Sequence, residues 1–87
     1  MKLVKCPKAF QAAELDGELL IIHGETGRFY ALKDVGLEVW RKLDEESDLD
    51  RLCTALTREF DADEQTVRDD VASFAADIVE IGFAEYR

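Results

Sequence analysis

Two turn sequences separate three apolar runs in residues 14–32, which read ELDGELLIIHGETGRFYAL. Asp16-Gly17 lies between the first two runs, and Asp-Gly favours the type I′ turn of a β-hairpin because both central residues need a positive φ. Residues 24–27, Gly-Glu-Thr-Gly, form a second turn sequence between the second and third runs. The sequence therefore predicts a meander of three antiparallel strands at residues 10–15, 19–22 and 28–32.

The composition of the strands adds two expectations. The middle strand, Leu-Leu-Ile-Ile at residues 19–22, is apolar throughout, which predicts that both of its faces are covered. The third strand carries the adjacent aromatic residues Phe29 and Tyr30. Because successive side chains of a strand point to opposite faces, one of these two rings must point away from the side that packs on the helices.

Apolar residues at helical spacing predict three helices in the rest of the chain. A residue that can cap a helix precedes each of them: Asp34, then Ser47 or Asp48, then Asp63. Gly82 ends the third helix, and residues 83–86 can form a short extended segment. The expected inner faces are Val35, Val39, Trp40 and Leu43 in the first helix, Leu49, Leu52, Cys53, Leu56 and Phe60 in the second, and Val67, Val71, Phe74, Ile78 and Ile81 in the third.

These elements predict one α+β domain spanning residues 1–87, in which a three-stranded antiparallel meander packs on three helices in a winged helix-turn-helix-like arrangement. A chain of 87 residues has room for a modest core but not for a deep enzyme cleft. A sheet of three strands leaves at least one edge free to pair with another chain.

Charge and composition exclude several classes of function. The 20 acidic residues outnumber the 11 basic ones, which gives a net charge of −9 and argues against binding to nucleic acid or to an anionic membrane. No apolar run approaches the roughly 20 residues that span a bilayer, so we expect a cytoplasmic protein. Cys6 and Cys53 lie far apart in the sequence and are expected to be free thiols, with Cys53 in the core.

No catalytic pattern stands out. The only histidine, His23, lies beside Gly24 and is interpreted as a solvated turn residue. No Ser or Cys has a histidine and an acid arranged around it in a recognisable pattern. The acidic pairs lack the ligand spacing of a calcium loop. We therefore expect no enzyme activity, no cofactor and no metal.

The free sheet edge offers another kind of function. An extended peptide can pair with exposed backbone groups, and pockets on alternate sides can bind its side chains. The third strand, residues 28–32, is the best candidate because it carries two aromatic residues and little charge. The alternative is that Phe29 and Tyr30 only fill the core.

The order of several motifs resembles the PqqD-like family, whose members are precursor-peptide recognition elements in the biosynthesis of ribosomally made, modified peptides. The resemblance covers roughly residues 9–85 and rests on the following segments: Leu15-Asp16-Gly17-Glu18-Leu19, Thr26-Gly27-Arg28-Phe29-Tyr30-Ala31-Leu32, Val35-Gly36, Val39-Trp40, Asp70-Val71 and Gly82. It implies that a precursor's leader segment adds as a strand to the third strand, against the third helix. The domain would then present the leader to a modifying enzyme or a leader peptidase.

The resemblance also implies which residues contact the leader. On the strand these are Arg28, Phe29, Tyr30 and Ala31, and on the third helix they are Val67, Asp70, Val71 and Phe74, of which the last two can equally belong to the core. Lys33 stands where the family often has Asn, and the chain lacks the Pro-Glu-Gly type segment of the quinone-cofactor member. These departures favour a lasso-peptide type of element.

Three other interpretations stay open at the level of sequence. One is a non-catalytic winged-helix subunit that docks on an enzyme without binding a leader. The others are a transcription factor and a small metal-dependent enzyme. The oligomeric state is also open, because a free edge permits either a monomer or a weak dimer that pairs through its edge strands.

Overall fold

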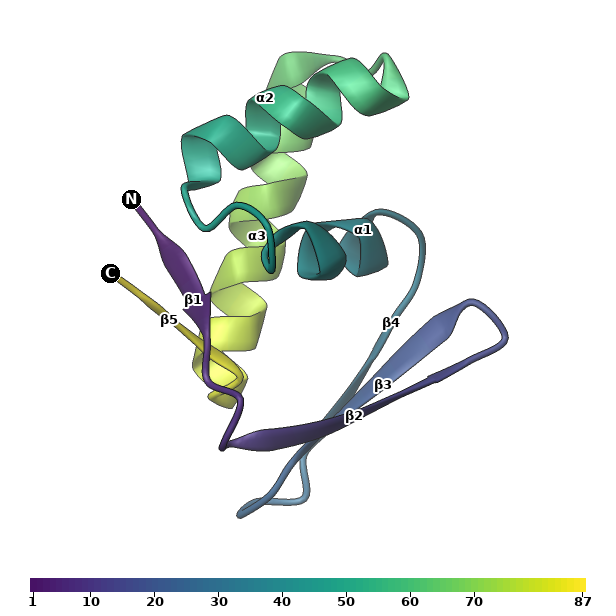
Figure 1. Ribbon diagram of the computed structural model, residues 1–87, viewed down its shortest axis with the longest axis vertical. Coiled ribbons are helices and arrows are strands. Elements are labelled where there is room, and N and C mark those ends of the chain that lie inside the picture. Colours follow the sequence, from purple (N-terminus) through teal and green to yellow (C-terminus); the bar gives the residue numbers. More distant parts are fainter.

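The structure, a computed structural model, describes residues 1–87 as five strands and three helices. In chain order they are β1 (Leu3–Lys5), β2 (Phe10–Leu15), β3 (Glu18–His23), β4 (Phe29–Leu32), α1 (Asp34–Lys42), α2 (Leu49–Phe60), α3 (Glu64–Ile81) and β5 (Ala84–Tyr86). Strands β2, β3 and β4 form an antiparallel sheet in that order, and the helices lie on one side of it (Figure 1). The predicted α+β meander is confirmed.

Both turns of the meander form where the sequence predicts them. Asp16 and Gly17 have φ angles of 51° and 80°, as a type I′ turn requires. At the second turn, His23 Nδ1 accepts hydrogen bonds from the backbone N–H groups of Glu25 (3.2 Å) and Thr26 (3.3 Å). His23 is therefore a turn residue, as predicted, although its side chain is half-buried and not fully solvated.

The middle strand differs from its prediction. Ile21 on the inner face is fully buried, but Leu20 and Ile22 on the outer face are 39% and 41% exposed. The expectation of a strand covered on both faces is wrong, because all of the helices lie on the same side of the sheet (Figure 1).

Two of the three helix starts follow the predicted capping. Asp48 accepts a hydrogen bond from the N–H of Arg51 at 3.1 Å, and Asp63 accepts one from the N–H of Thr66 at 3.0 Å. Asp34 does not cap α1. It is the first residue of that helix and has a φ of 55°, so its left-handed backbone turns the chain from β4 into the helix.

A second, two-stranded sheet joins the two ends of the chain. Strands β1 and β5 pair antiparallel, with Leu3 opposite Tyr86 and Lys5 opposite Ala84, and Figure 1 shows them beside α3. The sequence analysis predicts the extended C-terminal segment, which forms β5, but it does not predict β1. Leu3 and Phe83 are completely buried, so this sheet is anchored in the core.

The core consists of 17 buried apolar residues. Phe10 packs edge-on against the rings of Trp40 and Phe83, with centroid distances of 5.2 and 5.9 Å, and Cys53 is 4% exposed, as predicted. Val35 and Phe60 are exceptions, since they are predicted to face inward but are 44% and 48% exposed. Both lie at helix ends, where fewer neighbouring elements cover a side chain. None of the helices has the length and apolar character needed to cross a membrane.

Candidate functional site

Strand β4 is an edge strand whose free side exposes backbone hydrogen-bonding groups. It pairs only with β3, with Ile21 opposite Tyr30 and Ile22 opposite Phe29. The N–H of His23 donates to the carbonyl of Arg28 at 2.8 Å, and bonded pairs alternate along an antiparallel ladder. Tyr30 and Leu32 therefore bond to β3, whereas the N–H and C=O groups of Phe29 and Ala31 face the free edge.

The side chains of β4 alternate between the two faces of the sheet. Phe29 points to the outer face and is 68% exposed. Tyr30 points inward, and its hydroxyl donates a hydrogen bond to Asp77 Oδ2 on α3 at 3.2 Å. Burial of the phenol, followed by the negative charge and the hydrogen bond of Asp77, raises the pKa of Tyr30 above its usual value. This bond fixes the inner face of β4 to α3.

A hollow of about 200 Å³ lies between β4, the first turns of α1, and α3. We call it the strand–helix groove. It is lined by Tyr30 from β4, by Val35, Gly36 and Val39 from α1, and by Asp70, Ser73, Phe74 and Asp77 from α3. The groove runs beside the free edge of β4, so a strand added at that edge could place its inward-pointing side chains there.

The structure brings only part of the predicted site together. Tyr30, Asp70 and Phe74 line the groove, and Arg28, Phe29 and Ala31 lie on or next to the edge strand with exposed side chains. Val67 and Val71 do not line the groove. They are 7% and 1% exposed and belong to the core, and Val71 borders a different hollow beside Met1 and Leu49.

Several groove residues escaped the sequence analysis. Ser73 and Asp77 follow Asp70 at spacings of three and seven residues, which places them on the same face of α3. That spacing could have identified them once Asp70 was suspected. The helical spacing predicts Val35 and Val39 on the inner face of α1, and only the position of α1 beside β4 brings them to the groove.

The charges of the groove are all negative. Asp70 and Asp77 are its only ionisable carboxyl groups, and Asp77 is engaged by Tyr30. The one arginine of α3, Arg68, is held by Asp50 at 2.7 Å and by Glu64 at 3.2 Å. The groove therefore combines an apolar floor with an acidic lip. No three His, Cys, Asp or Glu side chains gather where they could hold a metal ion.

A family profile described as coenzyme PQQ synthesis protein D (PqqD) matches residues 18–84. The chain belongs to the PqqD family. This match covers β3 to α3 and ends at the first residue of β5, so it includes the edge strand and the groove. No curated protein matches the sequence.

Two solved structures share the fold along the whole chain. One is TbiB1 in complex with the TbiA(beta) leader peptide, with 26% identity, a TM-score of 0.82, and coverage of 100% of this chain and 98% of that chain. The other is a lasso peptide synthetase B1 complexed with the leader peptide, with 22% identity, a TM-score of 0.81, and coverage of 99% and 100%. At its lower identity the second structure supports the fold alone.

Proposed function

We propose that this protein binds the leader segment of a ribosomally made precursor peptide by β-strand addition at β4. It then presents the leader to a separate modifying enzyme or leader peptidase, as in lasso-peptide-type biosynthesis, and has no catalytic role of its own. One observation carries the proposal: β4 exposes the backbone groups of Phe29 and Ala31 directly beside a groove with an apolar floor.

Family membership supports this role. The similarity to TbiB1, a structure that contains a leader peptide, extends over the whole chain. The absence of the Pro-Glu-Gly type segment favours the lasso type over the quinone-cofactor type. The cytoplasmic location and the independence from any cofactor stay predictions.

In this mechanism, backbone pairing supplies affinity and the groove supplies specificity. Backbone pairing with Phe29 and Ala31 depends little on the peptide's sequence, whereas side chains that enter the groove are selected by shape and charge. The peptide must become ordered on binding, which limits the affinity of a short segment. Once bound, it has a raised effective concentration at the enzyme on which this domain docks.

The proposed contact residues are Arg28, Phe29, Tyr30 and Ala31 on the strand side and Asp70 and Phe74 on the helix side. Of the remaining residues implied by the family, Val67 and Val71 are buried. We assign these two an indirect role, in which they help to hold α3 in place as part of the core.

A second candidate function is a non-catalytic subunit that docks on an enzyme without binding a leader. The outer face of the sheet favours it, because Leu20, Ile22 and Phe29 are 39%, 41% and 68% exposed and no element covers them. Uncovered apolar surface of this kind often marks a protein interface.

Fluorescence anisotropy with labelled leader peptides, taken from precursor genes encoded beside this one, tests the two candidates. We expect nanomolar to low micromolar affinity for one of these leaders. Asp70→Lys should weaken binding, because it reverses a charge at the acidic lip, while the exposed position leaves the fold intact. If the folded protein binds none of the leaders, the docking subunit becomes the better explanation. Sizing at several concentrations will detect an edge-strand dimer.

A further inference from the structure

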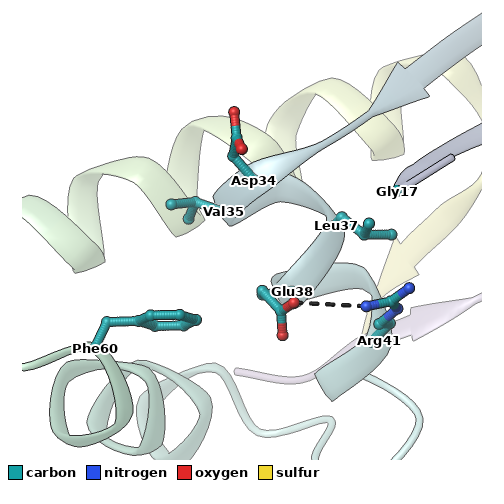
Figure 2. A pocket seen from close by; sticks show the side chains of 7 residues that line it. All are labelled: Gly17, Asp34, Val35, Leu37, Glu38, Arg41 and Phe60. Carbon is teal, nitrogen blue, oxygen red and sulfur yellow. Dashed lines mark ion pairs between the residues drawn. The ribbon is translucent and has the colours of Figure 1, made fainter.

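A second hollow opens on the other side of Val35 from the strand–helix groove. Its volume is about 460 Å³, which lies within the roughly 300–1,000 Å³ of small-molecule pockets. We call it the α1–α2 hollow. Its walls are Gly17 from the β2–β3 turn, Asp34, Val35, Leu37, Glu38 and Arg41 from α1, and Phe60 from the end of α2 (Figure 2).

Two uncovered apolar side chains face this hollow. Figure 2 shows the ring of Phe60 reaching from α2 toward α1, with Val35 on the opposite side of the gap. These residues are 48% and 44% exposed, although their positions at helical spacing predict burial. Nothing in the chain covers them, so a ligand that filled the gap would remove apolar surface from water.

The charged residues around the hollow leave one carboxylate free. Arg41 pairs with Glu14 and, at 3.6 Å, with Glu38, so its charge is satisfied within the protein. Asp34 takes part in none of the ion pairs or side-chain hydrogen bonds of the chain.

The hollow adjoins the proposed leader site at Val35. Val35 lines both the strand–helix groove and the α1–α2 hollow. Strand β4 ends at Leu32, and the chain enters α1 at Asp34. Asp34 and Val35 therefore lie just beyond the end of β4, where a paired peptide that extends past Leu32 can contact them.

We propose that the α1–α2 hollow is a second peptide subsite, which binds a bulky apolar residue of the leader lying outside its paired strand. That residue packs between Val35 and Phe60, and a neighbouring Lys or Arg of the leader pairs with Asp34. This inference rests on the proposed function, since the peptide must first be held at β4. With this subsite, the affinity depends on leader residues outside the paired strand, which strand pairing alone does not contact.

The test compares leader peptides of different length. The probe is the labelled leader of the adjacent precursor, together with versions shortened residue by residue from each end. We expect Phe60→Ala to weaken binding of the full leader about tenfold, which is typical of losing a substantial aromatic contact. Peptides shortened past the apolar residue at one end should bind Phe60→Ala and the unchanged protein equally.

Control variants separate this subsite from strand pairing. Tyr86→Ala removes an aromatic residue of similar exposure, 42%, on β5 and should leave binding unchanged. Asp34→Asn should reduce the salt dependence of binding. A photo-crosslinking residue in place of Phe60 should capture the full leader but not the shortened one, which gives a readout independent of stability.

The outcomes distinguish the two proposals. If the unchanged protein binds no leader, both are overturned. If it binds, and Phe60→Ala binds the full leader as tightly as the unchanged protein with no crosslink at position 60, the second subsite is overturned and leader binding at β4 stands. If Phe60→Ala weakens binding of the full leader and shortening one end removes this difference, the second subsite is supported, and that end shows the direction in which the peptide runs along β4.

Discussion

We expect Ala31→Pro to abolish most leader binding while the fold is kept. Ala31 of β4 lies opposite Leu20 of β3. At this position the backbone N–H of Ala31 faces the free edge and takes no part in the ladder with β3. Proline removes this N–H, and an edge strand tolerates proline where the lost donor faces outward. The substitution therefore acts on the proposed peptide contact and not on the sheet.

The magnitude follows from one backbone hydrogen bond. Losing a bond that leaves its partner unsatisfied in a partly buried site costs about 1–3 kcal/mol. This energy corresponds to a Kd raised by roughly 5- to 150-fold. Any clash of the proline ring with the incoming strand adds to the loss.

The matched control is Ala12→Pro on β2, the opposite edge strand of the same sheet. Leu15 pairs with Glu18 next to the hairpin turn, so by alternation the N–H of Ala12 also faces outward. Anisotropy with the labelled leader, alongside thermal unfolding of each variant, makes the comparison. The reasoning is refuted if Ala31→Pro is folded and binds normally, or if Ala12→Pro weakens binding as much.

Three further predictions concern stability. Phe83→Ala should cost about 3–5 kcal/mol in urea unfolding, because Phe83 is completely buried, and a much smaller loss would contradict its role as an anchor. Gly82→Ala should cost about 1–3 kcal/mol, since φ is 98° and the new Cβ would lie 3.0 Å from Nε2 of His23; an unchanged Tm would show that this turn relaxes. Tyr30→Phe should cost about 1 kcal/mol near neutral pH through loss of the bond to Asp77. The pKa of Tyr30 is raised on folding, so this stabilisation is complete below about pH 10 and is lost as the pH rises through the folded-state pKa. The difference in unfolding free energy between Tyr30→Phe and the unchanged protein, measured by urea unfolding, should therefore shrink as the pH rises through that pKa.

Local chemistry accounts for what could be read from the sequence. Asp16-Gly17 specifies its own turn, because few other residue pairs accept two positive φ angles. Asp48, Asp63 and Gly82 specify helix ends through bonds within a few residues. The apolar stripe of α3 predicts its buried face, and Val67, Val71, Phe74 and Ile78 are all buried there.

The candidate site was only partly predictable, because its residues come together through contacts between elements that are far apart in the sequence. The family resemblance predicts Tyr30, Asp70 and Phe74 as leader contacts, but it does not predict that Val35, Val39 and Asp77 line the same groove. Asp77 shares a helix face with Asp70, but its partner Tyr30 lies 47 residues away. No local pattern reports a contact over that separation.

The sequence by itself determined the three strands, the three helices, most of their ends and the free edge of the meander. Only the tertiary structure decided that the helices cover one face of the sheet, that β1 pairs with β5, and that Val35 and Phe60 face an open hollow. The physical reason is the distance along the chain over which each kind of interaction acts. Turn and capping preferences act within a few residues, whereas burial depends on which element arrives from elsewhere in the chain.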